Sequence, residues 1–356
     1  MFNVNFINRH IVFQQKDIRI EIRKGYLNEY IEEHLCVKLR LPVSFVILFF
    51  MRFRILVRLL RLSVNNFKQI SSSEFIFSFK GAIYSYNRIT KQILLEHKLR
   101  FKMSRPLNIS KIEGLKGFDD MYVYGEYFAN LTNEEVCIYG RSPLKNDWSK
   151  KYVFTEGHIN HIHNIIPDKE SNSVFVLTGD KDAEIFIYEF KNNFSQSRII
   201  VEGEQYYRAC NIFKIGDAFL YATDSPLQYN FIYKLDVDAK KEVLRKINGP
   251  CIYSTMWHNN WVFVTSVEPE YSDNVLKYLF TWKRSRFIER NEMVVYIGNL
   301  ASGFQEVLSF KKDFWPGGLF QFANAEIVQA DNELILYLVG VKKFDGYSCI
   351  IEDGKF

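Results

Sequence analysis

The sequence predicts a β-propeller, an all-β fold built from four-stranded blades. Short runs of apolar and β-branched residues recur from about residue 66, and turn residues separate them. The same strand–turn–strand unit returns at spacings of 45 and 42 residues, measured from Thr178 to Thr223 and from Thr223 to Thr265. A repeated unit of about 40–50 residues has the length of one propeller blade.

The repeated unit has a recognisable ending. Its second strand runs into a small polar cluster, which reads Thr178-Gly-Asp180, Thr223-Asp-Ser225 and Thr265-Ser-Val-Glu268 in three successive units. Units begin near residues 66, 105, 158, 207, 251 and 320, which favours six blades. If the two ends of the chain pair to close the ring, the number of blades could instead be five or seven. A β-sandwich is the rival fold, but it does not require this repeated ending.

Composition agrees with one large all-β domain. The chain has 356 residues, of which 47% are hydrophobic and 16% aromatic, and aromatic residues suit a pleated, half-buried surface. Only 18 glycines and 8 prolines are present, which argues against a disordered chain. The five cysteines are scattered without a CxxC spacing, so we expect buried free thiols.

The positive charge is concentrated in an N-terminal extension, residues 1–65, ahead of a propeller over residues 66–356. The extension holds 11 Lys and Arg against 5 Asp and Glu, whereas the remainder holds 35 against 36. No nucleic-acid motif accompanies this charge, so no nucleic-acid partner is expected. No secretory signal is recognised at the start, and a cytoplasmic location is expected.

Residues 42–63 form the most unusual stretch of the extension. Arg54, Arg58 and Arg61 follow a short apolar run at helical spacing, which predicts a basic amphipathic helix within a small α-containing extension. Such a helix can lie on an anionic membrane surface. It can equally pack on the protein itself with its arginines solvated or paired to acids. The apolar run is short for a membrane-spanning helix.

Three of the seven histidines lie within six positions, at His158, His161 and His163. In a strand, His161 and His163 project from the same face because side chains alternate with period two. Two imidazoles on one face suit acid–base chemistry, substrate contact or a divalent metal, and a structural role stays open. Asp180 or Glu184 could supply a third metal ligand. No other cofactor is expected.

The next unit opens on Gln205-Tyr206-Tyr207-Arg208, one blade after the histidines. The Arg208 guanidinium can hold a carboxylate through two hydrogen bonds. Tyr207 or Tyr206 can deliver a proton. The alternative is an aromatic pair in the core with an arginine that braces a loop.

Acidic residues recur where second strands end, at Glu126, Asp180, Asp224 and Glu268. A pair of carboxylates suits glycoside hydrolysis, in which their separation decides the stereochemistry. Asp180 and Asp224 can instead form side chain–backbone turns between strands. Arg105 and Gln321 are further polar positions at blade edges.

The segment Ser142-Pro-Leu-Lys-Asn-Asp-Trp148 resembles the Asp-box hairpin of sialidase-like (BNR-repeat) propellers, Ser-x-Asp-x-Gly-x-Thr-Trp. The stretch HIHNIIPDKESNSVFVLTGD is similar to a strand pair of BNR-type proteins found among polysaccharide-processing proteins. Sialidases surround the substrate carboxylate with arginines, and the resemblance makes Arg105 and Arg208 candidates for two of them. The His161, His163, Tyr207 and Arg208 set is also similar in kind to that of propeller polysaccharide lyases.

Two hypotheses of function follow. In the first, the propeller is a lyase or glycoside hydrolase that acts on an acidic poly- or oligosaccharide at its axis. In the second, it binds a glycan or a protein without catalysis, with a membrane contact through residues 42–63. The catalytic candidates are His161, His163, Tyr207, Arg208, Asp180 and Glu126. The substrate-binding candidates are Arg105, Gln205, Asp224, Glu268 and Gln321.

Overall fold

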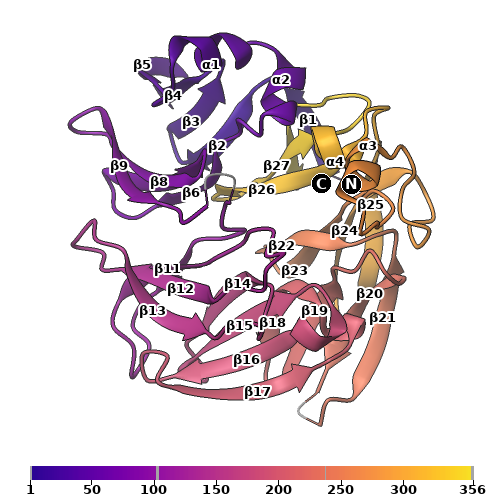
Figure 1. Cartoon of the computed structure of the whole chain (residues 1–356). Helices are drawn as coiled ribbons and strands as arrows, with labels where there is room; N and C mark the ends of the chain where they lie inside the picture. The colour runs from indigo at the N-terminus through magenta and orange to yellow at the C-terminus, as the bar shows by residue number, and fades with distance from the viewer. Residues whose placement is uncertain (1, 102–103, 237, 354–356) are drawn as a thin grey trace. The chain divides into compact units, whose positions relative to one another are not determined.

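The computed structural model describes residues 2–101, 104–236 and 238–353, and strands dominate it (Figure 1). Five sheets have four strands each, in sequential order. They comprise β6 (Asn65–Gln69), β7 (Glu74–Phe79), β8 (Ala82–Asn87) and β9 (Gln92–Lys98); β10 (Ser110–Ile112), β11 (Met121–Gly125), β12 (Val136–Arg141) and β13 (Ser149–Phe154); β14 (His161–Asp168), β15 (Ser173–Gly179), β16 (Phe186–Lys191) and β17 (Gln196–Glu202); β18 (Ala209–Ile215), β19 (Ala218–Thr223), β20 (Asn230–Leu235) and β21 (Lys241–Ile247); and β22 (Cys251–Trp257), β23 (Asn260–Thr265), β24 (Glu292–Asn299) and β25 (Gly303–Lys311).

The sixth sheet has eight strands, in the order β1-β28-β27-β26-β2-β3-β4-β5. Its two halves are four-stranded antiparallel meanders, joined where β2 and β26 run parallel. The predicted β-propeller of four-stranded blades is therefore confirmed. Five blades are separate sheets, and counting each meander as a blade gives seven, rather than the favoured six. The strands are β1 (Phe2–Ile7), β2 (His10–Gln15), β3 (Ile18–Arg23), β4 (Tyr26–Ile31), β5 (His34–Arg40), β26 (Asn324–Ala330), β27 (Leu334–Val339) and β28 (Ser348–Asp353).

The recurring threonine has a structural explanation. The hydroxyls of Thr178, Thr223 and Thr265 each accept a hydrogen bond from a backbone amide of the third strand in their own blade, at 3.0, 2.9 and 2.9 Å. A hydroxyl at this position thus ties the end of the second strand to the third strand. The donating amides are those of Phe186, Phe231 and Val294.

The N-terminal extension differs from its expected form. A small α-containing extension over residues 1–65 was expected ahead of the propeller, but residues 2–40 fold into β1–β5 and join the eight-stranded sheet. Strand β1 pairs with β28, so the two ends of the chain complete one meander. The pairing of chain ends that the sequence left open is therefore present.

Two short helices replace the single amphipathic helix predicted over residues 42–63. They are α1 (Phe45–Phe50), which Ser44 caps, and α2 (Arg54–Leu59). Arg54 donates to both carboxylate oxygens of Asp345 at 3.1 and 3.0 Å. Arg58, with a side chain only 2% exposed, pairs with Asp313 and Asp345. The arginines of α2 therefore bind acids of the protein, whereas Phe45 of α1 is 76% exposed.

The chain divides into two compact units. Unit 1 contains residues 1–75, 86–93 and 247–356, and unit 2 contains residues 76–85 and 94–246. Each unit has buried apolar clusters of its own. Among the described residues, no helix is long and apolar enough to cross a membrane. The remaining short helices are α3 (Val275–Phe280), α4 (Gly317–Phe320), and the 3-10 turns η1 (Asp182–Glu184) and η2 (Gln205–Tyr207).

Candidate functional site

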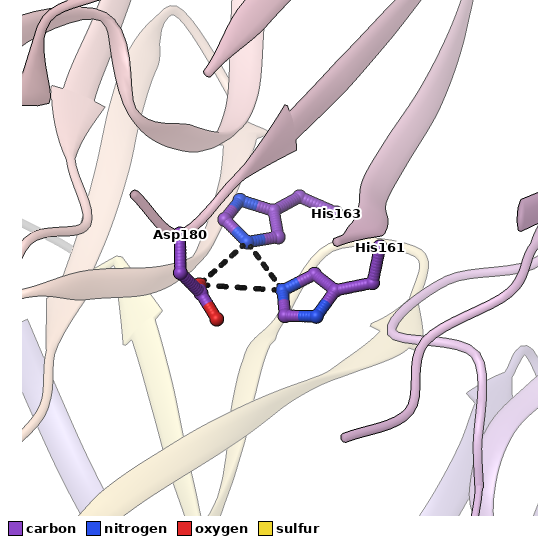
Figure 2. A group of neighbouring side chains, drawn as sticks. All are labelled: His161, His163 and Asp180. Carbon is purple, nitrogen blue, oxygen red and sulfur yellow. Dashed lines mark hydrogen bonds and ion pairs between the residues drawn. The ribbon is translucent and has the colours of Figure 1, made fainter. Parts of the chain in front are cut away.

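The candidate site lies in unit 2, where β14 begins beside the end of β15. His161 is paired with Gly179 and Ile162 with Thr178, but the register then shifts and Asn164 is paired with Leu177. His163 is therefore the extra residue of a β-bulge. Bulges commonly re-aim a side chain next to functional sites. Here the two imidazoles still face each other (Figure 2).

The two imidazoles meet through their Nε2 atoms, which are 3.1 Å apart. Nδ1 of His163 lies 3.1 Å from the carbonyl oxygen of Ala209. A carbonyl oxygen only accepts, so Nδ1 of His163 carries the hydrogen and its Nε2 presents a lone pair. Both rings are buried, and burial lowers the pKa of His163, which keeps its imidazole neutral near neutral pH.

Asp180 closes a triangle with the two rings (Figure 2). Its Oδ1 lies 3.3 Å from Nε2 of His161 and 3.6 Å from Nε2 of His163. Burial opposes ionisation, but the charge of Arg208 and the nearby imidazoles hold the pKa of this carboxyl well below its usual range. The Asp180 side chain is 34% exposed, whereas the two imidazoles are almost fully buried. A ligand would therefore meet the carboxylate first.

Arg208 lies between two carboxylates. Its NH2 group is 2.8 Å from Oδ1 of Asp180 and 3.7 Å from Oδ2 of Asp224. Oδ2 of Asp224 also accepts a hydrogen bond from the Cys210 thiol at 3.1 Å. The guanidinium charge is therefore shared between acids of the protein.

Tyr127, which follows β11 in the neighbouring blade, covers His161. The two ring centroids are 4.2 Å apart. Burial, followed by the charges of Asp180, Cys210 and Asp224, raises the pKa of the Tyr127 phenol well above its usual value. The phenol is therefore protonated at neutral pH and can donate a hydrogen bond or a proton.

Gly179 makes room for His163. A Cβ atom at Gly179 would lie 2.7 Å from Cε1 and 3.0 Å from Nε2 of His163. Contacts this short are not tolerated, so any larger residue would displace the imidazole. The Thr-Gly-Asp ending of β15 thus positions both Asp180 and the histidine opposite it.

The structure brings together five of the candidates named from the sequence: His161, His163, Asp180, Arg208 and Asp224. Gln205 adjoins them, since its side-chain amide donates to the Asp180 carbonyl oxygen at 2.8 Å and its Oε1 accepts from Ser225 at 2.6 Å.

Other candidates have different surroundings. Tyr207 packs in an apolar cluster of unit 2, and the Lys241 Nζ atom lies 4.6 Å from the centroid of its ring. Glu126 binds Arg100 and the Cys137 amide, each at 2.9 Å. Arg105 is half-buried between β9 and β10. Glu268 and Gln321 belong to unit 1, and the Glu268 carboxylate accepts from Ser266 at 3.3 Å.

Two residues at the site, Tyr127 and Cys210, were not among the candidates predicted from the sequence. Tyr127 immediately follows Glu126, which was named because it occupies the end of a second strand. The residue after each such acid is the signal that could have identified it, because a tyrosine there carries a hydroxyl donor. Cys210 was treated with the other cysteines as a buried thiol, and it is buried. Only the fold places its sulfur beside Asp224.

Within the part of the chain that the structure describes, two sets of potential metal ligands share His163. One is His161, His163 and Asp180, and the other is His163, Cys210 and Asp224; within each set the ligand atoms lie within 4.8 Å of one another. The arrangement combines two buried imidazoles, an ionised carboxylate and a protonated phenol. It can bind a cation, transfer protons, or hold a polar ligand.

Comparisons with known proteins give the class of fold. No protein-family model matches the chain, and no curated protein matches its sequence. The chain is similar in structure to an oligogalacturonate lyase from Vibrio parahaemolyticus, with a TM-score of 0.55, 10% identity, and coverage of 100% of this chain and 98% of that chain. It is also similar to the AfRom2 CNH domain, with a TM-score of 0.54, 6% identity, and coverage of 100% and 98%.

At such identities the likeness concerns the fold alone, because unrelated functions share propeller folds. The chain is a β-propeller. The resemblance to sialidase-like proteins is supported at the level of this fold, and no family match supports the Asp-box motif itself.

Proposed function

We propose that this propeller is a carbohydrate-active protein that processes an acidic glycan at the site around His161 and His163. The observation that carries the proposal is the meeting of two buried imidazole Nε2 atoms 3.1 Å apart beside the partly exposed Asp180 carboxylate. Buried, strongly perturbed titratable groups that face a ligand-accessible carboxylate are typical of functional sites. The likeness of the fold to an oligogalacturonate lyase is compatible with this substrate class.

The charges favour elimination over hydrolysis. A glycoside hydrolase pairs one protonated carboxylic acid with one ionised carboxylate. In this site Arg208 faces both Asp180 and Asp224, and the pKa of Asp180 is held low. Burial does raise the pKa of Glu126, but its carboxylate binds Arg100 and the Cys137 amide. The carboxylates of the site are therefore poor candidates for the acid of a hydrolase.

Elimination next to a uronic acid needs a base for the C5 hydrogen and an acid for the leaving oxygen. A base held at the imidazole pair takes the C5 proton, and the C–H electrons form the C4=C5 double bond. The C4–O bond breaks at the same time, and the Tyr127 hydroxyl gives its proton to the leaving oxygen. Tyr127 thus takes the role of proton donor that was predicted from the sequence for Tyr207 or Tyr206.

The test is turnover of acidic and neutral polysaccharides, followed through the ultraviolet absorbance of an unsaturated product. Tyr127→Phe is expected to lower kcat by about 10²–10⁴-fold, because it removes the proton donor. Tyr207→Phe is the matched control, since that ring packs in the core, and it is expected to retain turnover. Reducing ends without ultraviolet absorbance would indicate a hydrolase. Binding of an acidic glycan without turnover would leave a binding module.

A second candidate function is attachment to an anionic membrane surface through α1. Phe45, Phe49 and Phe53 are 76%, 53% and 46% exposed, and the nearby Arg40 and Arg52 are also exposed. Aromatic side chains flanked by arginines suit the headgroup region of such a membrane. Co-sedimentation with phosphatidylserine vesicles, lost in a Phe45→Ser/Phe49→Ser variant, would support this. Equal recovery with phosphatidylcholine vesicles, or no binding to either, would refute it.

A further inference from the structure

The charges around the two histidines do not suit an anionic sugar unless a cation is added. Arg208 faces two carboxylates, Asp180 and Asp224. Counted formally, one guanidinium and two carboxylates leave one net negative charge among these three groups. We infer that a divalent transition-metal ion binds between His161, His163 and Asp180. This inference deepens the proposed function, and it rests on that function only for what the ion does to the glycan.

The spacing of the three ligand atoms fits such an ion. Zinc–nitrogen and zinc–oxygen bonds of about 2.0–2.2 Å in a tetrahedron place neighbouring ligand atoms about 3.3–3.5 Å apart. The three separations here are 3.1, 3.3 and 3.6 Å. Figure 2 shows the three side chains converging on one point. Little movement would be needed to complete one triangular face of the coordination shell.

The histidines are also set up as ligands by their surroundings. The hydrogen bond from Nδ1 of His163 to the Ala209 carbonyl fixes the tautomer whose Nε2 can bind a metal, as metal-ligating histidines usually require. Because Nε2 of His163 presents a lone pair, the hydrogen of the contact between the two rings lies on Nε2 of His161. Nδ1 of His161 has no hydrogen-bond partner among the described residues, so the hydrogen can move to Nδ1 when Nε2 binds a metal. Asp180 is ionised and contacts Arg208, which orients its carboxylate.

The ligand types point to the class of metal. Two imidazoles and one carboxylate with open positions favour Zn²⁺, Fe²⁺, Co²⁺ or Mn²⁺ over Ca²⁺ or Mg²⁺, which prefer all-oxygen shells. The second set, His163 with Cys210 and Asp224, competes for the same imidazole. In the second set, the Cys210 thiol already donates a hydrogen bond to Asp224. The lone pair of His163 is on Nε2, and this atom faces His161. The first set is therefore the one we assign.

The ion would supply what the proposed elimination lacks. It changes the net charge of the site from negative to positive, and it can accept the carboxylate of an acidic sugar as a further ligand. It would also lower the pKa of a bound water, so that hydroxide held at the imidazole pair is the base. Arg208 is then a positioning residue for Asp180, in place of the direct uronate contact predicted from the sequence.

The experiment is a cobalt titration of the chelator-treated, dialysed full-length protein, read by calorimetry and by the visible absorption of bound Co²⁺. A single equivalent is expected to bind, and Zn²⁺ is expected to displace it. Asp180→Asn and His161→Gln are expected to weaken binding by about 100-fold or more, because each removes a ligand. Asp180→Asn is nearly isosteric and partly exposed, so it also serves if the histidine variant fails to fold.

Two control variants make the result specific. His158 lies three residues before His161, but its ring contacts the Tyr188 hydroxyl at 2.6 Å instead of the proposed metal ligands. The variant His158→Gln should therefore leave Co²⁺ affinity unchanged. Cys210→Ser should also leave affinity unchanged. Loss of binding in Cys210→Ser but not in Asp180→Asn would overturn the assignment in favour of the second set. Absence of Co²⁺ and Zn²⁺ binding to the wild-type protein would overturn it altogether.

The metal site and the glycan function fail in different ways. Binding is measured without any sugar, so a bound ion with no turnover of any glycan would uphold the site and refute the proposed function. Glycan turnover by protein that binds no Co²⁺ or Zn²⁺ would do the reverse.

Discussion

The stretches His10-Ile11-Val12 and His161-Ile162-His163 begin two first strands, β2 and β14, with the same backbone pattern. In each, the first two residues pair with the next strand and the register shifts at the third, at Val12 and at His163. His10 nevertheless stacks on Tyr337, with ring centroids 3.6 Å apart, whereas His161 faces His163 and Asp180. One backbone pattern therefore supports a closed structural cluster in unit 1 and a candidate site in unit 2.

The difference lies in the charged neighbours. Beside His10 the charge that acts is positive: burial, followed by the charge of Arg54, lowers the pKa of His10 to about 3. Beside His161 the nearest charge is the Asp180 carboxylate, which favours a cation at the imidazoles. The two strands thus share one backbone pattern, and the charged residue beside each histidine differs: Arg54 acts on His10, and Asp180 contacts His161.

The largest expected effect tests whether the unit 1 cluster is structural. Arg58→Ala should lower the free energy of unfolding by about 3–5 kcal/mol, because it removes a buried guanidinium that pairs with Asp313 and Asp345 and donates to two backbone carbonyl groups, and it leaves Asp313 with Lys312 as its ionic partner. Arg52→Ala, an exposed arginine in the same segment, should change it by less than about 0.5 kcal/mol. Urea denaturation measures both. Equal, small effects would mean that α2 is not held by its arginines.

The blades and the shared face of His161 and His163 could be predicted from the sequence. The other features depend on contacts between segments that are distant in the sequence. The Thr178, Thr223 and Thr265 repeat predicted the blades because each hydroxyl acts within its own blade. The alternation of side chains predicted that His161 and His163 would share a face.

Contacts between different blades could not be predicted from the sequence, because they join segments that are far apart along the chain. Tyr127 reaches His161 from another blade, and Tyr207 was named only because it adjoins Arg208 in the sequence. The turn η2 directs Tyr207 into the core. Strand β1 pairs with β28 at the opposite end of the chain, which no local pattern indicates.

The second effect is a pH dependence that arises from His10. Its folded-state pKa of about 3 lies below the unfolded value of about 6.5, so the unfolded chain binds the proton first. The contribution of neutral His10 is fully present above pH 6.5 and is lost as pH falls toward 3. Between pH 7.5 and pH 5 the loss should be about 2 kcal/mol. His10→Gln should remove that part of the pH dependence, and an unchanged profile in this variant would contradict the assignment.

The third effect tests the packing of the candidate site. Gly179→Ala should destabilise the protein by about 1–3 kcal/mol, because the new Cβ would overlap the His163 ring. In the double variant Gly179→Ala/His163→Ala the ring is absent, so the cost of the new Cβ should be largely recovered. Chemical denaturation of the four proteins gives the coupling energy. Additive effects would show that the glycine and the histidine do not press against each other.

The smallest expected effect separates the two histidines most sharply. His161→Gln should change the free energy of unfolding by less than about 1 kcal/mol at pH 7.5, because residues placed for function are seldom optimised for stability. His10→Gln should cost more, since it replaces a ring that is stacked on Tyr337 and buried. Thermal and urea denaturation of the two variants, under identical conditions, make the comparison. A loss at His161 as large as that at His10 would mean that the imidazole pair is itself a structural contact, and the case for a ligand there would then rest on metal titration alone.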